Sequence, residues 1–210
     1  QEKLLEKEVV DLKDLTPIRP NLYLWQGDIT RLAVDVIVNA ANSKLLGCFA
    51  PNHSCIDNAI HTAAGVELRL ACHEIMQEQG RDEVTGQAKM TKAYNLPSRY
   101  VLHTVGPIIY DEVTDLERRQ LASSYEECLN LAYEKGLRSL AFCCISTGEF
   151  RFPNEEATKI AIETVLQFQK EHPDMVVIFN VFKDIDYTIY QALLKKQCFY
   201  IEVVDGCNRQ

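Results

Sequence analysis

The stretch Val34-Asp-Val-Ile-Val-Asn-Ala-Ala-Asn42 decides the fold class that this sequence predicts. Its first part is almost continuously apolar, which is typical of a strand covered on both faces. Further apolar segments that predict strands lie at residues 21–25, 87–94, 99–105, 140–145 and 175–182. Segments with helical periodicity lie at residues 56–79, 115–135, 153–169 and 185–196. Strands that alternate with helices in this way predict a layered α/β domain.

The two ends of the chain differ in composition from this alternating region. Apolar residues among charges at positions 1–14 predict a short amphipathic helix. We therefore expect an N-terminal extension over residues 1–19 that packs on the domain, a domain over 20–197, and a tail over 198–210. Within the tail, Phe199-Tyr-Ile-Glu-Val-Val204 is compatible with either an edge strand or an unstructured end.

Charge and cysteine content restrict the classes of function. The 210 residues carry a formal net charge of −8, which argues against a nucleic-acid-binding surface. A site for one phosphorylated small molecule remains compatible, because backbone N–H groups bind phosphate without a basic patch. The sequence shows no signal peptide and no apolar run of about 18 residues, so we expect a soluble, cytoplasmic protein with reduced thiols and no membrane partner.

The loop Gly47-Cys-Phe-Ala-Pro-Asn-His-Ser-Cys55 contains a candidate metal site. Cys48, His53 and Cys55 form a Cys-x4-His-x-Cys pattern, and two thiolates with one imidazole are ligands that suit zinc. Three protein ligands leave one tetrahedral position open, which is typical of a catalytic site. The alternative is that two buried cysteines flank an incidental loop histidine.

Polar and small residues follow the predicted strands, where α/β sheets bind their ligands. Asn39 and Asn42 either read sugar hydroxyls or close a turn. Asp28 either accepts a hydrogen bond from the amine of a base or caps a turn. The segment Ser146-Thr-Gly-Glu-Phe150 can form an anion-binding nest of backbone N–H groups.

The histidines outside the loop point to packing roles. His61 lies in a predicted helix, and we expect it to pack rather than to bind a metal. His103 lies within an apolar strand, and we expect a buried histidine whose ring nitrogens are hydrogen bonded.

Five segments together resemble the macrodomain family. They are Gln26-Gly-Asp-Ile-Thr30, Val34 to Asn42, Ile56-Asp-Asn-Ala-Ile-His-Thr-Ala-Ala-Gly65, Tyr94 to Pro107 and Ile145-Ser-Thr-Gly-Glu-Phe150. The resemblance implies a three-layer α/β/α fold with a mixed, mostly parallel sheet that binds ADP-ribose. The cysteine-containing loop replaces a glycine-rich loop and resembles that of the zinc-containing protein-ADP-ribose hydrolases.

The resemblance also implies roles for individual residues. Asp28 would hold the adenine amino group, Ile29 would line that pocket and Phe182 would stack on the base. Asn42 and Asp57 would flank the distal ribose and contribute to catalysis. The remaining implied ADP-ribose contacts are Cys55, Ile56, Ser146, Thr147, Gly148, Glu149 and Phe150.

These expectations combine into one predicted activity. The protein would be a zinc-dependent hydrolase, with one Zn2+ per chain, that removes mono-ADP-ribose from modified protein side chains. Its partners would then be ADP-ribose and the modified protein. Two alternatives are a non-catalytic ADP-ribose-binding module and an esterase that acts on free O-acyl-ADP-ribose.

Overall fold

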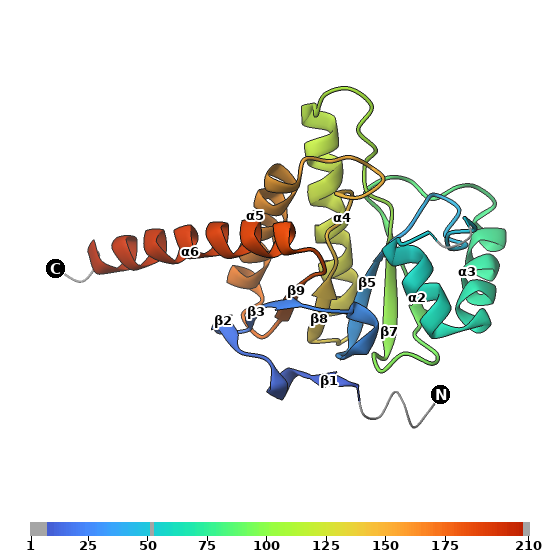
Figure 1. Ribbon diagram of the computed structural model, residues 1–210, viewed down its shortest axis with the longest axis horizontal. Helices are drawn as coiled ribbons and strands as arrows, with labels where there is room; N and C mark the ends of the chain where they lie inside the picture. Colours follow the sequence, from blue (N-terminus) through green and yellow to red (C-terminus); the bar gives the residue numbers. More distant parts are fainter. Residues whose placement is uncertain (1–7, 51–52, 208–210) are drawn as a thin grey trace.

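A seven-stranded mixed sheet forms the centre of the computed structural model, which describes residues 8–50 and 53–207, with side chains up to Lys196 (Figure 1). The strand order is β2-β3-β9-β8-β5-β7-β6, and only the edge strands β2 and β6 are antiparallel to their neighbours. The strands span Pro17–Arg19 (β2), Leu22–Gln26 (β3), Val36–Ala40 (β5), Ala88–Lys92 (β6), Tyr100–Thr104 (β7), Ser139–Phe142 (β8) and Val176–Val181 (β9). The predicted mixed, mostly parallel sheet is confirmed.

Helices cover both faces of the sheet. The chain forms α2 (Ile56–Ala64), α3 (Val66–Gln79), α4 (Asp115–Glu134), α5 (Asn154–Glu171) and α6 (Asp184–Cys207), with 3-10 turns η1 (Leu12–Asp14) and η2 (Ile29–Arg31). On one face, α5 contacts both α4 and α6. On the other face, α2 contacts α3 and η2. Among the described residues, no helix is both long and apolar enough to cross a membrane.

Strand β5 occupies the middle of the core and explains the apolar stretch from which the fold was predicted. Ile37 lies opposite Val101 of β7 and Ala141 of β8, and all three are fully buried. Burial of a side chain such as isoleucine contributes roughly 1.5–3 kcal/mol. Because β3, β5, β8 and β9 run parallel, the loops that follow them emerge at one edge of the sheet.

The described part of the N-terminal segment is not the helix that its pattern predicted. Within its described part, Val10–Asp11 (β1) pairs with Leu32–Ala33 (β4), and β2 pairs with β3, so the main sheet begins before residue 20. The pairing of Val10 and Asp11 with Leu32 and Ala33 explains the difference, because a contact between distant segments overrides a local helical preference, and only Leu12–Asp14 forms a 3-10 turn. Residues 1–7 lie outside the described chain.

The C-terminal segment also differs from both alternatives considered for it. Helix α6 continues to Cys207 instead of ending near residue 196, so residues 199–204 form neither an edge strand nor an unstructured end. No glycine or proline interrupts this segment before Gly206. Each added helical residue gains a hydrogen bond, which here outweighs the strand preference of aromatic and β-branched residues. Residues 208–210 are not described.

The single helix predicted over residues 56–79 is two helices that meet at Gly65. The φ and ψ angles of Gly65 are 94° and 178°, a region that only glycine adopts readily. A Cβ atom at this position would lie 2.7 Å from Asn95 Nδ2. The glycine therefore allows α2 to end and α3 to begin without an intervening loop.

Replacing Gly65 by Ala should lower the free energy of unfolding by about 1–3 kcal/mol, because alanine is strained in this backbone conformation. Urea denaturation would measure the change. Gly80→Ala is the matched control, since Gly80 ends α3 with φ 69° and ψ 10°, and no atom lies within 4 Å of the position that an added methyl group would take. A loss at Gly65 no larger than at Gly80 would contradict this account of the break.

Candidate functional site

Two loops meet at the carboxyl ends of the central strands (Figure 1). Residues 41–55 connect β5 to α2, and residues 143–153 connect β8 to α5. His53 Nε2 of the first loop lies 3.2 Å from Glu149 Oε1 of the second. Most of the residues predicted to contact a ligand belong to these two loops, so the fold brings them to one place.

The predicted metal ligands are close together. One ligand atom from each of Cys48, His53 and Cys55 lies within 4.8 Å of the others, and Cys48 Sγ is 3.3 Å from His53 Nδ1. All three residues are half-buried, whereas the alternative interpretation assumed buried cysteines. Two soft thiol ligands and one imidazole nitrogen at this separation fit a tetrahedral zinc ion with one open position.

The surroundings of the two thiols move their pKa values in opposite directions. The N–H group of Ala50 lowers the pKa of the Cys48 thiol, and His53 lowers it further. Burial raises the pKa of Cys55, whose Sγ caps helix α2 by accepting from the Asn58 N–H at 3.4 Å. Asn58 Nδ2 also donates to the carbonyl of His53 at 2.9 Å, so the start of α2 holds the end of the loop in place.

Asp57 is a buried carboxylate beside this cluster. It is 5% exposed and lies in the first turn of α2, where the helix dipole favours a negative charge. Its Oδ1 accepts from Asn39 Nδ2 at 2.8 Å, and its Oδ2 accepts from Asn42 Nδ2 at 3.4 Å. Burial raises the pKa of Asp57, and the Asn39 hydrogen bond offsets part of that increase.

His103 holds Asn39 in position from behind. Asn39 Nδ2 lies 3.2 Å from His103 Nδ1, and His103 Nε2 lies 2.9 Å from Thr91 Oγ1. Burial lowers the pKa of His103 to about 3, so the ring is neutral. Nδ1 then accepts from Asn39 and Nε2–H donates to Thr91, which confirms His103 as a buried and hydrogen-bonded histidine.

His61 packs beneath the metal-ligand loop, as expected from the sequence. Its side chain is buried, and its Nε2 lies 3.5 Å from Asp57 Oδ1. A Cβ atom at Gly47 would lie 2.9 Å from His61 Cγ, so the loop backbone lies directly on the imidazole. Burial lowers the pKa of His61 to about 4.

The two asparagines of the first loop have different roles. Asn39 is fully buried and uses its amide on Asp57 and His103, so the interpretation that it reads a sugar hydroxyl is wrong. Asn42 is half-buried, and its Nδ2 donates to the Gly47 carbonyl at 3.2 Å and to Asp57 Oδ2 at 3.4 Å. Its Oδ1 also accepts from the Lys44 N–H at 3.0 Å and closes the turn.

The second loop presents a row of backbone donors. Within the described chain, the N–H groups of residues 147–150 donate no hydrogen bond. The loop is closed by the Phe152 N–H to the Ser146 carbonyl at 3.0 Å and by the Arg151 N–H to the Gly148 carbonyl at 3.0 Å. Ser146 has φ 64°, which turns the chain at the start of this row. Such a row of free N–H groups is a nest for an anion.

The side chains predicted at the adenine end lie near the ends of β3 and β9. Asp28 caps η2, because its Oδ1 accepts from the Thr30 N–H at 3.0 Å and the Thr30 hydroxyl at 2.7 Å. Asp28 is nevertheless exposed, and these bonds leave its Oδ2 available. Phe182 is 75% exposed, whereas Ile29 is 1% exposed in the core and offers little surface to a ligand.

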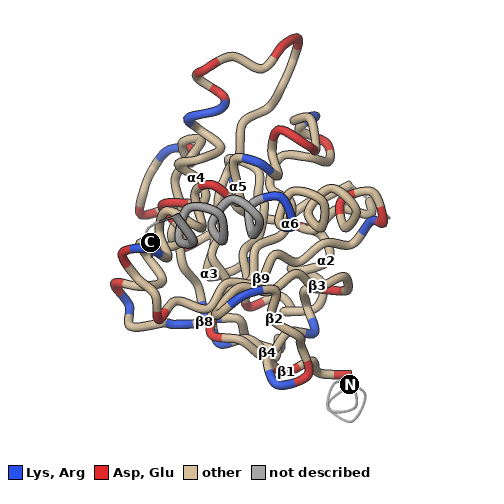
Figure 2. Tube along the Cα trace, turned by 90° about the vertical axis from the view of Figure 1, so that its left-hand side faces the viewer, with Lys and Arg blue, Asp and Glu red and all other residues tan. Residues whose placement is uncertain are grey.

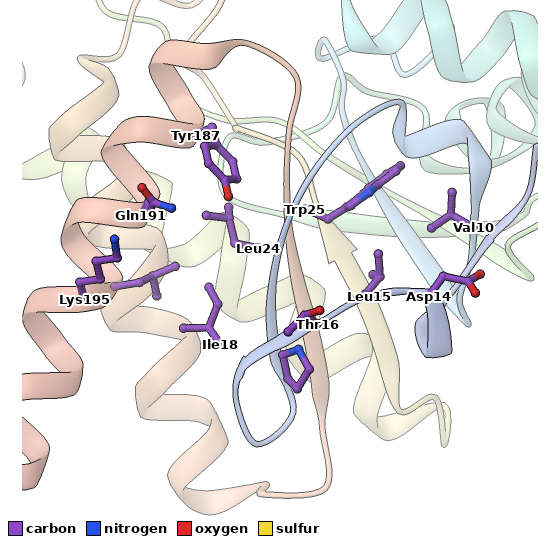
Figure 3. A pocket seen from close by; sticks show the side chains of 12 residues that line it. Val10, Asp14, Leu15, Thr16, Ile18, Leu24, Trp25, Tyr187, Gln191 and Lys195 are labelled. Carbon is purple, nitrogen blue, oxygen red and sulfur yellow. The ribbon is translucent and has the colours of Figure 1, made fainter.

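A separate groove of about 560 Å³ lies between the N-terminal segment, β3 and α6 (Figure 3). Its walls include Trp25, Ile18 and Tyr187. None of the predicted site residues lines it. The groove is therefore distinct from the loops at the strand ends.

Comparison with known proteins agrees with this arrangement. The Macro domain family matches residues 38–161, which is more than half of the chain. This chain belongs to the Macro domain family. A protein-ADP-ribose hydrolase from Treponema medium is 53% identical to this macrodomain over 199 residues, covering 92% of this chain and 76% of that protein. A protein-ADP-ribose hydrolase from Staphylococcus aureus strain MRSA252 is 53% identical over 196 residues, covering 92% and 74%.

Solved macrodomains share the fold. A variant of the Oceanobacillus iheyensis macrodomain with ADPR has a TM-score of 0.79 at 41% identity, covering 88% of this chain and 97% of that one. The Trypanosoma brucei macrodomain in complex with ADP-ribose has a TM-score of 0.77 at 36% identity, covering 89% and 77%. The three-layer macrodomain fold that the sequence predicted is confirmed.

Reasoning from the sequence missed the support behind Asp57. Asn39 of β5 is directly opposite His103 of β7. On its other side, His103 is opposite Lys89 of β6, which lies two residues before Thr91, the hydrogen-bond partner of His103. The available signal was a polar residue inside each of two apolar strands. Recognising it required the register between strands, which neither segment specifies alone.

The free energy of unfolding should fall as pH is lowered from about 7 to about 5. His61 and His103 stay neutral in the folded protein, with pKa values of about 4 and about 3, but take up protons near pH 6.5 when unfolded. The unfolded state then binds more protons, and each histidine costs up to about 1.4 kcal/mol per pH unit.

Urea denaturation at the two pH values would measure this decrease. His73→Gln removes an exposed histidine and should leave the decrease unchanged. A free energy of unfolding that does not change between the two pH values would show that the buried histidines carry protons in the folded state.

Proposed function

We propose that this macrodomain is a hydrolase that removes mono-ADP-ribose from modified protein side chains. The observation that carries the proposal is Asp57, a buried carboxylate in the first turn of α2, two residues after Cys55 of the thiol–imidazole cluster, which is formed by Cys48, His53 and Cys55. The two relatives named protein-ADP-ribose hydrolases, at 53% identity, support the same activity.

The binding of ADP-ribose follows from the three parts of the site. Phe182 would stack on adenine, and Asp28 Oδ2 would accept from its amino group. The N–H groups of residues 147–150 would hold the diphosphate, as an anion nest does. Lys and Arg residues are spread among acidic ones over several elements (Figure 2), so we assign this anion binding to the backbone rather than to a basic patch. The distal ribose would then reach Asn42 and Asp57.

We propose that one zinc ion is held by Cys48, His53 and Cys55. The fit rests on the two thiols and the imidazole nitrogen, whose ligand atoms lie within 4.8 Å of one another. When bound, zinc supplies Lewis acidity toward a substrate oxygen. The side chains of Asn42 and Asp57 would orient the substrate and transfer the proton.

Asp57 and Asn42 have separate roles in the proposed reaction. Asn42 would orient the distal ribose, which contributes through positioning. Asp57 would orient a water molecule and accept its proton, and a pKa above the ordinary aspartate value makes it a stronger base. The water attacks either the anomeric carbon or, in an ester-linked substrate, the acyl carbon. Cleavage releases ADP-ribose and the unmodified side chain.

Replacing Asp57 by Asn should reduce turnover by at least about 100-fold, because an amide of the same shape does not accept a proton. Affinity for ADP-ribose should change far less, since most of the expected contacts lie on other residues. Release of ADP-ribose from a modified protein and a separate calorimetric titration would measure the two effects. Asp174→Asn, which changes an exposed carboxylate before β9, is the control.

Three outcomes would contradict this account. A wild-type protein that binds ADP-ribose but releases none from aspartate-, glutamate-, serine- or arginine-linked substrates would be a reader module. Full turnover by Asp57→Asn would place the chemistry elsewhere. Activity confined to free O-acyl-ADP-ribose would indicate the esterase.

Elemental analysis of protein purified without chelators should find about one zinc per chain, as expected for a single three-ligand site. Cys48→Ser and Cys55→Ser should lose the metal and the hydrolase activity together. Cys128→Ser is the control for loss of a thiol, because Cys128 is buried in the core away from the loop. A wild-type protein that is fully active without a transition metal would contradict the zinc proposal.

A further inference from the structure

A side-chain contact joins the two functional loops across a separation of 96 positions in the sequence. His53 Nε2 lies 3.2 Å from Glu149 Oε1. His53 belongs to the loop of the thiol–imidazole cluster, and Glu149 lies within residues 147–150, whose N–H groups are free. The contact therefore connects the proposed metal site to the proposed diphosphate site.

The imidazole of His53 presents its two nitrogens to different partners. Nδ1 lies 3.3 Å from Cys48 Sγ, whereas Nε2 faces Glu149. A metal held with the two thiols would therefore take Nδ1 and leave Nε2–H to donate to the carboxylate. A carboxylate that accepts from the second nitrogen of a ligating histidine fixes the tautomer and the orientation of the ring.

We propose that Glu149 is a positioning residue that couples metal occupancy to the binding of a nucleoside diphosphate. This inference rests on the proposed zinc and ADP-ribose sites. Metal binding fixes His53, and His53 then holds Glu149 and restricts the loop that contains it. A loop that is already ordered loses less conformational entropy when the diphosphate binds. Thermodynamic linkage requires the converse, so the diphosphate raises the metal affinity by the same factor.

The size of the coupling follows from the exposure of the pair. The His53 side chain is 32% exposed and the Glu149 side chain 74% exposed. Exposed ion pairs and hydrogen bonds are weak, which places the coupling at the low end of the usual range, on the order of fivefold.

ADP is the probe that isolates this coupling. ADP-ribose could also be coupled to the metal directly, through its distal ribose, but ADP has no distal ribose. Calorimetry would give the dissociation constant of ADP for zinc-loaded and zinc-free protein. Competition with a chromophoric chelator would give the zinc affinity with and without ADP. We expect both ratios to be about fivefold in the wild-type protein.

Three variants test whether Glu149 carries the coupling. Glu149→Ala should bring both ratios to about one. Glu149→Gln should keep much of the coupling, because its amide oxygen still accepts from Nε2–H. Glu155→Ala is the matched control, since it removes an exposed charge from the first turn of α5 and should leave the ratios unchanged.

The outcomes separate this inference from the proposed function. Unchanged ratios in Glu149→Ala, or ratios of one in the wild-type protein, would overturn the coupling and leave the hydrolase and its zinc standing. A wild-type protein that binds no zinc would overturn both the metal proposal and the coupling. Coupled binding without release of ADP-ribose from any modified protein would overturn the hydrolase and support the role of Glu149.

Discussion

The site depends on one carboxylate that is buried and must therefore be hydrogen bonded. Asp57 is 5% exposed, and a buried charge is costly unless it is hydrogen bonded. Asn39 provides that bond at 2.8 Å, and the first turn of α2 adds a favourable dipole. Neutral His103 in turn fixes Asn39. Asn39 and His103 are therefore polar residues inside the apolar strands β5 and β7 because they stabilise the buried carboxylate of Asp57, Asn39 directly and His103 through Asn39.

The parallel arrangement of strands makes the rest of the site possible. The loops after β5 and β8 emerge at one edge, so the thiol–imidazole cluster and the row of free N–H groups come together there, joined by the His53–Glu149 contact. Neither loop alone contains a complete site for ADP-ribose. Ser146 has a positive φ, a strained backbone conformation, and the N–H groups that follow it are free to bind a ligand. The strands that precede the two loops are buried, β8 throughout and β5 up to Asn39. Rigid strands thus position loops that remain able to respond to ligands.

Local sequence patterns predicted β3, β5, β6, β7, β8 and β9, most helices and the proximity of Cys48, His53 and Cys55, because each of these depends on neighbours along the chain. The chain of contacts behind Asp57 could not be predicted in the same way, since it depends on the register of β5 and β7. Over residues 8–14, the predicted N-terminal helix is wrong because the pairing of Val10 and Asp11 with Leu32 and Ala33, which are distant in sequence, outweighs the local apolar periodicity. The break at Gly65 depends on φ 94°, a conformation that glycine permits but does not require.

The central claim is that one ADP-ribose molecule spans both loops with its distal ribose beside Asp57. A crystal structure of the zinc-loaded protein soaked with ADP-ribose tests it most directly. The account predicts density for adenine against Phe182, for the diphosphate over residues 147–150, and for the distal ribose between Asn42 and the Cys48–His53–Cys55 cluster. Density for the ligand in the groove beneath α6, or a distal ribose remote from Asp57, would contradict it.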